Sequence, residues 1–407
     1  MDSSTHDIQE WKSALSATDR YSIIQSISES LGNNVVEAIA IEQAAFQVSS
    51  TREDYDTACR PTASPPPQRD DQNADDSQGE NSDDAGLQIG PYKNCVPVSE
   101  GITSQVYRSG DCALKVIVSY HNIEPHNPQR EVKILKTLRE PCISLVDVFR
   151  DREQQLVLVF PFKPYTLADL IDKQAISLPQ VRVIFTDVLN ALKDIHGQGI
   201  IHRDVKPSAV LLDSPDGPAF LSDFGTAWHP EFSANSEPAK NKVLDIGTGP
   251  YRAPETLFGN VEYGASVDMW SLGVMLSEVI RTPPEPIFES RPAHEDGSQL
   301  GLILSIFKTL GTPTPETWPE AKAFKVAPFE LWTVFPVRSW DDILPNVDSD
   351  FRDLVASLLR YDGNRATSEQ ALKHPCLTIS RPSMASDLDK VEAGVIRATP
   401  ATLYSIV

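Results

Sequence analysis

The alternation of hydrophobic and polar residues divides the chain into segments of different kinds. Between residues 93 and 160, short apolar runs such as CALKVIV and QLVLVF alternate with polar turns, and the stretch PQREVKILKTLRE has apolar residues at helical spacing. Short apolar runs bounded by polar turns are typical of strands. This segment is therefore predicted to form an antiparallel sheet that carries one helix.

Helical periodicity dominates the chain after Pro164. Apolar positions recur at helical spacing in the segments 167–173, 179–198, 267–280, 299–310, 351–359 and 367–373. A small sheet lobe, residues 91–160, followed by a large helical lobe, residues 164–377, is the α+β architecture that this order predicts.

The two ends of the chain follow other patterns. Apolar residues at helical spacing around a break at Gly32 predict a helical extension over residues 1–48. Residues 49–90 are rich in Asp, Ser, Gln, Asn and Pro, so we predict a disordered acidic linker there. Residues 378–407 are predicted to form a flexible C-terminal tail.

Most of the net charge lies in the N-terminal extension. The chain has 57 acidic and 36 basic side chains among 407 residues, a net charge of -21. Residues 1–90 hold 17 acidic and 5 basic side chains, or -12, which leaves -9 for the rest. Binding to nucleic acid or to an anionic membrane needs clustered Lys and Arg. We therefore expect neither a nucleic-acid nor a membrane partner.

The sequence shows no pattern typical of export, membrane insertion or metal binding. The longest apolar runs fall short of the roughly 20 residues that cross a bilayer, and the first ten residues do not follow a signal-peptide pattern. The five cysteines are scattered, unlike those of a zinc site or a disulfide framework. We expect an intracellular protein of the cytoplasm, the nucleus or both.

Three motifs in the large lobe carry the most specific signal. HRDVK at residues 202–206 is followed by DFG at 223–225 and by APE at 253–255. In this order and at this spacing they resemble the motifs of the eukaryotic protein kinase family. The resemblance covers residues 92–376. It implies a bilobal kinase fold and transfer of phosphate from ATP to a protein substrate.

The resemblance assigns catalytic roles to residues of the large lobe. Phosphoryl transfer needs cations on the phosphates, carboxylates for Mg2+ and an acceptor for the hydroxyl proton. Asp204 would take that proton, and Lys206 would neutralise the transferred phosphoryl group. Thr248 would contact Asp204.

The nucleotide site is implied in the same way, with ATP and Mg2+ as cofactors. Lys115 would contact the nucleotide phosphates and pair with Glu131, and Asp223 would bind Mg2+. The phosphate loop, the hinge and the apolar residues around adenine would complete the site: Ser99, Gly101, Val106, Ala113, Phe160, Pro161, Lys163 and Leu211. Pro161 has no N–H, so Lys163 is expected to supply the donor to adenine.

Two loops depart from the family pattern. The phosphate loop keeps one glycine of three, Gly101, which weakens or reshapes the clamp on the nucleotide. Ala209 stands where the family has an Asn that binds a second Mg2+. Two hypotheses follow: an active serine/threonine kinase that works with one metal site, and a pseudokinase scaffold that binds nucleotide weakly or not at all.

The activation segment, between the DFG and APE motifs, also departs. Val243 occupies the position of the activating Thr of cyclin-dependent kinases, so that position cannot be phosphorylated. Arg130 and Arg203, which would clasp such a phosphate, are expected to pair with a carboxylate instead. Asp245 and Glu237 are the two candidates.

Further positions place the resemblance within the cyclin-dependent kinase branch. Asp268 resembles the residue that supports the catalytic loop, Arg365 resembles the partner of Glu255, and the sequence LGTP at 310–313 resembles the insert of that branch. Pro128 alters the helix that cyclins recognise, so no conventional cyclin partner is expected. Together these features resemble the fungal single-subunit CDK-activating kinases, which implies a monomer whose protein substrate is a cyclin-dependent kinase.

Overall fold

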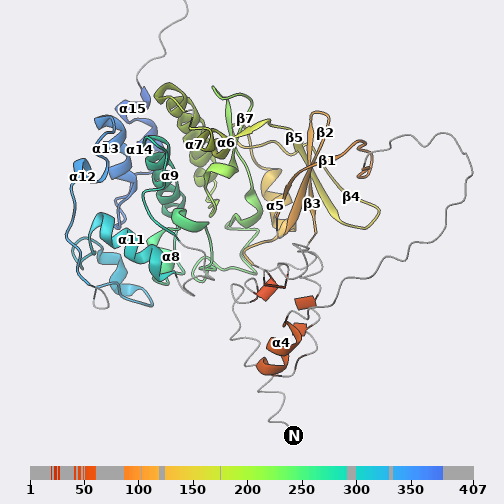
Figure 1. The fold of residues 1–407 in the computed structure, drawn as a ribbon, viewed down its shortest axis with the longest axis horizontal. Helices are drawn as coiled ribbons and strands as arrows, with labels where there is room; N and C mark the ends of the chain where they lie inside the picture. Colours follow the sequence, from red (N-terminus) through yellow and green to blue (C-terminus); the bar gives the residue numbers. More distant parts are fainter. Residues whose placement is uncertain are drawn as a thin grey trace, which may run out of the picture.

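The structure is a computed structural model of the chain. It describes residues 51–60, 87–101, 103–118, 124–174, 176–290, 299–329 and 333–378, and isolated positions between 20 and 49. A sheet lobe with one helix lies beside a larger helical lobe, the first at the right and the second at the left of Figure 1. Among the described helices, none has the length and apolar character needed to cross a bilayer.

The small lobe is a five-stranded antiparallel sheet, in the order β1-β2-β3-β5-β4. Its strands are β1 (Val96–Glu100), β2 (Ser104–Ser109), β3 (Cys112–Ile117), β4 (Asp147–Arg150) and β5 (Leu156–Pro161). Helix α5 (Pro128–Leu135) begins at Asn127, whose side chain accepts a hydrogen bond from the Arg130 N–H, with Pro128 in the first turn. The predicted sheet carrying one helix is confirmed.

The two faces of this sheet pack differently. On one face, Leu114 and Val116 of β3 join a small core with Val157 and Val159 of β5. The alternate residues of β3, including Lys115, point to the opposite face because side chains of a strand alternate. That opposite face is available to form the cleft between the lobes.

The large lobe is mainly helical, and the predicted helices are confirmed to within one or two residues at most ends. They are α6 (Leu167–Asp172), α7 (Leu178–Gly197), α9 (Ser266–Val279), α11 (Leu300–Leu310), α13 (Ser349–Leu358) and α14 (Ser368–Leu372). The short helices α8 (Pro254–Leu257), α12 (Trp340–Ile343) and α15 (Pro375–Thr378) were not predicted. Every residue of α9 after Ser266 is buried, so this helix is the centre of the lobe.

A second sheet at the base of the cleft was missed by the sequence analysis. It has three short antiparallel strands, β6 (Tyr165–Thr166), β7 (Val210–Leu212) and β8 (Ala219–Leu221). Strands of two or three residues are too short to show a period of two. This sheet matters because the catalytic loop leads into β7 and the DFG motif follows β8.

The predicted disordered linker over residues 49–90 is wrong at its start. Helix α4 (Arg52–Ala58) begins at Thr51, whose side chain accepts a hydrogen bond from the Asp54 N–H. Tyr55 of α4 is buried against Ile27 and Ala45, and this contact offsets the polar composition of the segment. Residues 61–86 lie outside the described residues, and the Leu87 carbonyl already accepts a hydrogen bond from the Cys95 N–H at 2.8 Å.

Only part of the predicted helical extension over residues 1–48 can be assessed. The described positions among them, such as Ile23, Ile27, Ile41 and Phe46, are helical. The other residues of that prediction, and the predicted tail after residue 378, lie outside the described residues.

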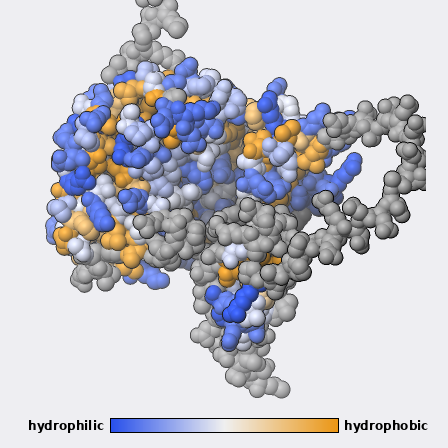
Figure 2. Space-filling view, viewed as in Figure 1, coloured by the Kyte–Doolittle hydropathy of each residue, from blue (hydrophilic) through white to orange (hydrophobic). Residues whose placement is uncertain are grey.

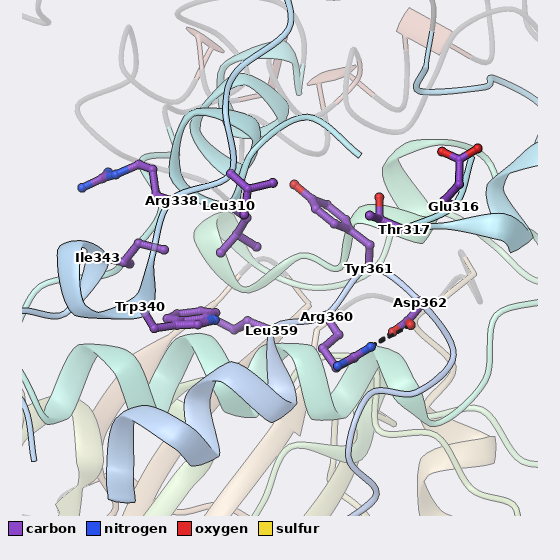
Figure 3. Close-up of a pocket in the computed structure, with 11 residues that line it drawn as sticks. Leu310, Glu316, Thr317, Arg338, Trp340, Ile343, Leu359, Arg360, Tyr361 and Asp362 are labelled. Carbon is purple, nitrogen blue, oxygen red and sulfur yellow. Dashed lines mark hydrogen bonds and ion pairs between the residues drawn. The ribbon is translucent and has the colours of Figure 1, made fainter. Parts of the chain in front are cut away.

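The described residues of the large lobe line an open pocket at the surface. On the face shown in Figure 2, hydrophilic residues predominate and hydrophobic ones form scattered patches. The pocket has a volume of about 350 Å³, and its lining combines Leu310, Trp340 and Ile343 with the ion pair between Arg360 and Asp362 (Figure 3). None of its lining residues belongs to the predicted catalytic or nucleotide site.

Candidate active site

A cluster of three charged groups joins the two lobes. The Lys115 Nζ lies 2.7 Å from Glu131 Oε1 of α5 and 3.0 Å from Asp223 Oδ1 of the DFG motif. The predicted pairing of Lys115 with Glu131 is confirmed. Helix α5 is thus in the position that brings its carboxylate to the lysine of β3.

Burial and mutual charge fix the protonation of this cluster. Burial alone would lower the pKa of Lys115, but the charges of Asp223 and Glu131 outweigh it and raise that pKa. The charge of Lys115 holds the pKa of Asp223 well below its usual value, although the partial loss of water around this half-exposed carboxylate opposes the shift. At neutral pH the lysine is therefore cationic and Asp223 is ionised.

The predicted catalytic residues of the large lobe form a second cluster. The Thr248 hydroxyl donates to Asp204 Oδ1 at 2.6 Å, and Lys206 Nζ donates to Asp204 Oδ2. Lys206 also donates to Thr248 Oγ1 at 3.2 Å. The predicted contact between Thr248 and Asp204 is confirmed, and the activation segment is tied to the catalytic loop through it.

Helix α9 supports the catalytic loop from below. The buried Asp268 accepts hydrogen bonds from the N–H groups of His202 and Arg203, each at 2.8 Å, and contacts His196 Nε2 at 2.9 Å. These bonds hold Arg203 at a φ of 71°, a left-handed backbone angle that is unfavourable for a residue with a side chain. The predicted supporting role of Asp268 is confirmed.

Three of the predicted adenine residues share one face of the small-lobe sheet with Lys115. Val106 is opposite Lys115 in the β2–β3 pair, and Ala113 is opposite Phe160 in the β3–β5 pair. Residues opposite each other share a face, as do residues two apart, so these four side chains lie on one side of the sheet. Leu211 lies on β7 of the second sheet.

The hinge follows β5. The Phe162 N–H donates to the Asp111 carbonyl at 2.8 Å, which anchors this connection to the small lobe. The Lys163 ammonium pairs with Asp213 at 2.7 Å and lies 3.7 Å from the centre of the Phe220 ring. Lys163 therefore fixes the hinge to the second sheet through its side chain, a contact that the sequence did not predict.

The phosphate loop is a tight hairpin. Ser99 is opposite Val106, and the Gly101 N–H donates to the Ser104 carbonyl at 2.9 Å. A Cβ on Gly101 would lie 3.3 Å from that same carbonyl, a close approach that favours glycine. The one glycine that this loop keeps therefore stands where a side chain would be crowded.

Ala209 lies beside the DFG motif. It is almost fully buried, and its carbonyl accepts hydrogen bonds from the Ser222 N–H at 2.8 Å and the Ser222 hydroxyl at 2.9 Å. Residue 209 is therefore next to Asp223 in space, as the resemblance requires for a metal-binding Asn. Its methyl group offers no oxygen to a cation.

Of the two candidate carboxylates for the arginines, the structure selects Glu237. Arg203 Nη1 lies 2.7 Å from Glu237 Oε1, and Arg130 Nη1 lies 3.2 Å from Glu237 Oε2. The alternative, Asp245, is wrong because it forms an ion pair with Arg252 instead. Both arginines lie in the interior, so the carboxylate that reaches them is the buried one.

Two positions close to the candidate site were missed by the sequence analysis. Glu124 binds Arg130 at 2.7 Å, and His126 lies within electrostatic reach of Asp204 and Asp223. The following Asn127 N–H donates to the Gly225 carbonyl at 3.3 Å. Nothing in the spacing of these residues could have revealed these contacts, because they depend on the path of the segment before α5.

The donor set fits a nucleotide with one bound Mg2+. The Asp223 side chain is 47 % exposed and offers ionised oxygen, which is the ligand that Mg2+ prefers. Lys115 and Lys206 are the cations that would be available to phosphate oxygens. Within the described residues, no group of three or more His, Cys, Asp or Glu side chains forms a separate metal site.

Comparison with known sequences agrees with the resemblance to the protein kinase family. The family description "protein kinase domain" matches residues 98–377. The serine/threonine-protein kinase csk1 of Schizosaccharomyces pombe is 38% identical over 245 residues, or 60% of this chain and 78% of the yeast protein.

Two proteins of Dictyostelium discoideum are also similar. A probable cyclin-dependent serine/threonine-protein kinase is 30% identical, and the probable serine/threonine-protein kinase glkA is 32% identical, each over 70% of this chain. The matches span 44% and 59% of those two proteins.

Among solved structures, a chain of the yeast RNA Pol II CTD kinase CTDK-1 complex is similar, with a TM-score of 0.58 and 24% identity. This match covers 74% of the present chain and 95% of the yeast chain. It shows the same two-lobed fold.

Proposed function

This chain belongs to the protein kinase family, as a serine/threonine kinase of the cyclin-dependent-kinase-like group, and we propose that it is an active, cyclin-independent enzyme whose substrate is the activation loop of a cyclin-dependent kinase. The assembled cluster of Lys115, Glu131 and Asp223 carries the proposal. This arrangement supplies the charges that phosphoryl transfer needs.

The chemistry follows from the positions of the side chains. The acceptor hydroxyl oxygen would bond to the γ-phosphorus of ATP as the bond to the ADP oxygen breaks, and Asp204 would accept the hydroxyl proton. Lys206 and Thr248 hold the Asp204 carboxylate in place for this task. The Mg2+ that accompanies ATP would neutralise phosphate charge near Asp223.

Independence from a cyclin is supported by α5. The chain alone brings Glu131 to Lys115 and joins the segment before α5 to the DFG motif through Asn127. An α5 that already lies in this position supports the proposal that no partner has to move it. The choice of a cyclin-dependent kinase as substrate is supported by the sequence resemblance, and the similarity to csk1 supports a serine/threonine kinase.

The test is transfer of labelled phosphate from ATP to a catalytically dead cyclin-dependent kinase, with a generic basic protein as second substrate. We expect label on the activation-loop Thr of the target. Asp204→Asn should lower the rate at least about 100-fold, because it removes the proton acceptor. Asp353→Asn is the matched control, an exposed Asp of α13 that should keep the wild-type rate.

Ala209 is the observation that favours the pseudokinase alternative. No label on either substrate, with nucleotide binding absent or weak, would contradict the proposal and support a scaffold. Label on the generic protein alone would support an active kinase but contradict the proposed substrate.

A further inference from the structure

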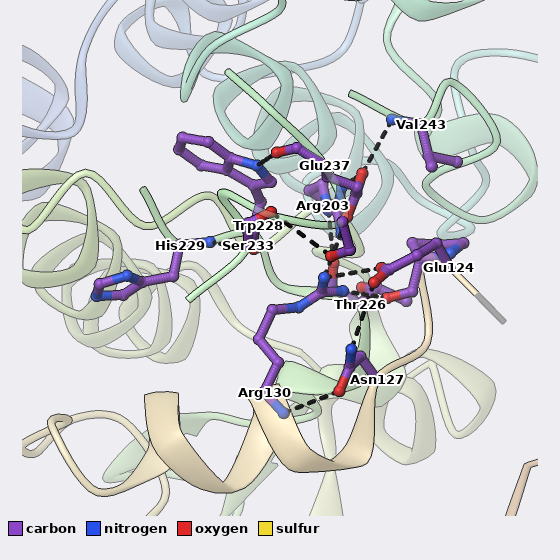
Figure 4. Close-up of polar contacts among 12 residues, drawn as sticks. Glu124, Asn127, Arg130, Arg203, Thr226, Trp228, His229, Ser233, Glu237 and Val243 are labelled. Carbon is purple, nitrogen blue, oxygen red and sulfur yellow. Dashed lines mark hydrogen bonds and ion pairs between the residues drawn. The ribbon is translucent and has the colours of Figure 1, made fainter. Parts of the chain in front are cut away.

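The activation segment carries an internal anion at the place where two buried arginines meet. Glu237 is 1% exposed, and both of its carboxylate oxygens are used. Oε1 accepts from Arg203 Nη1 at 2.7 Å and from the Val243 N–H at 2.9 Å, and Oε2 accepts from Arg203 Nη2 at 3.0 Å (Figure 4). The last donor is Arg130 Nη1, at 3.2 Å from Oε2.

A second carboxylate completes the cluster. Glu124, in the segment before α5, accepts from Arg130 Nη1 at 2.7 Å and from the Asn127 amide at 3.3 Å. The cluster therefore contains two arginines and two carboxylates, and its formal charge is zero. A phosphorylated side chain brings a charge of about -1.5 to -2 at neutral pH. Glu124 and Glu237 together supply the same charge without any modification.

The cluster joins three separate parts of the molecule, as Figure 4 shows. Arg130 belongs to α5 of the small lobe, Arg203 to the catalytic loop, and Glu237 to the activation segment. Arg203 also donates through Nε to the Thr226 carbonyl, just after the DFG motif. Ordering of this one site therefore sets the positions of α5, the catalytic loop and the activation segment together.

The rest of the activation segment is held around Glu237. The Trp228 indole N–H donates to the Glu237 carbonyl at 2.9 Å, and the Tyr263 hydroxyl donates to the Val243 carbonyl at 2.7 Å. The Lys242 ammonium lies 5.1 Å from the Trp228 ring and 5.1 Å from the Tyr263 ring. These contacts keep Thr248, further along the segment, at Asp204.

We propose that Glu237 and Glu124 form an internal acidic latch that orders the activation segment in place of a phosphate, so that the chain needs no activating phosphorylation. The proposal deepens the proposed function, since it concerns regulation of the same catalytic site. Its structural part, ordering of the segment by the latch, does not depend on any transfer activity.

The test uses the full chain made in bacteria, with and without phosphatase treatment. Glu237→Gln and the double variant with Glu124→Gln remove the charges at nearly constant shape. Glu231→Gln is the matched control, an exposed Glu of the same segment. The readouts are phosphate transfer to a generic basic protein and hydrogen exchange of residues 229–247.

We expect the wild type and Glu231→Gln to be equally active before and after phosphatase treatment. Glu237→Gln should lose activity about tenfold or more and should exchange hydrogen faster in the segment, and the double variant should lose more. Unchanged activity and exchange in Glu237→Gln, or loss of wild-type activity with phosphatase, would overturn the proposal.

Chemical rescue separates an anion latch from a general structural role. Glu237→Ala leaves both arginines and a space between them, so inorganic phosphate at tens of millimolar, about the range for a weak anion site, should restore part of the protection and activity. Chloride at the same ionic strength should not restore them. The wild type measured with the same phosphate concentration shows any effect of phosphate on the use of ATP. Equal rescue by both salts, or none, would contradict the latch. If the wild type transfers no phosphate, the proposed function fails, while hydrogen exchange still decides the latch.

Discussion

Ala209 is the residue whose substitution we expect to change the Mg2+ requirement of this chain. It lies beside Asp223, through the hydrogen bonds between its carbonyl and Ser222. We expect Ala209→Asn to add an oxygen ligand and to lower the Mg2+ concentration for half-maximal transfer by about tenfold. Rates over a Mg2+ series would measure this. Ala209→Leu adds similar bulk without an oxygen, and matching titrations for both variants would contradict the argument.

Glu237 gives the second prediction at this scale, from the direction of its pKa shift. Burial would raise its pKa, but the hydrogen bond and charge of Arg203 outweigh burial, so the pKa is lowered from its usual 4.5. A group whose pKa is lower in the folded state stabilises the folded state fully at pH values above its unfolded-state pKa. This contribution is lost as the pH falls through the folded-state pKa. The difference in unfolding free energy between wild type and Glu237→Gln should therefore stay constant from about pH 8 to 5.5 and shrink below about 4.5. Urea unfolding at several pH values would show it, and a difference that grows in acid would contradict it.

The sequence predicted side chains that belong to fixed motifs better than those on variable segments. Lys115, Glu131 and Asp204 stand at set spacings on elements whose geometry follows from their hydrogen bonds. The choice of Glu237 over Asp245 depends on how the activation segment folds back, because both carboxylates belong to that segment and lie far in sequence from Arg130 and Arg203. Glu124 gave no signal at all, since its contact is made by a loop.

At the scale of elements, the packing of α9 against α13 sets a strict limit on side-chain size. A Cβ on Gly273 of α9 would lie 2.8 Å from the Leu358 Cβ and 2.9 Å from the Leu359 Cδ2. The two helices can approach this closely only because position 273 has no side chain. Gly197 at the end of α7 has no such neighbour, because a Cβ there would meet nothing within 4 Å.

These two glycines give a matched pair of substitutions. Gly273→Ala should lower the free energy of unfolding by about 1–3 kcal/mol, because the added methyl overpacks the contact. Gly197→Ala should be neutral or raise it by about 0.4–1 kcal/mol, because it only restricts the unfolded chain. Thermal or urea unfolding of both variants would measure the two effects, and equal effects would contradict the packing argument.

Long elements with a clear period were the ones that the sequence could predict. Helices such as α7 and α9 show apolar positions over several turns, whereas β6, β7 and β8 contain only two or three residues each. Helix α4 was missed because its surroundings are polar, although Tyr55 and Cys59 lie one helical turn apart. Tertiary contact, rather than local composition, decides whether such a short segment is ordered.

At the scale of the whole molecule, the described residues form separate hydrophobic cores. The main core runs through the large lobe and includes Ile117, Ile134 and Leu158 of the small lobe, so the two lobes are packed as one unit. The core around Tyr55 is a separate small cluster. The charge divides in a similar way, since residues 1–90 hold -12 of the net -21.

Removal of residues 1–86 tests this separation. The main core is intact without them. The free energy of unfolding of the truncated chain should therefore equal that of the same transition in the full chain, within about 0.5 kcal/mol. Its net charge should fall from -21 to -9, because every charged side chain of residues 1–90 precedes residue 87. The rate of transfer to a generic basic protein should then depend less on salt concentration, because the less acidic chain attracts that substrate more weakly. A lower unfolding midpoint would show instead that the extension packs on the kinase lobes, and its core would then have to be counted with theirs.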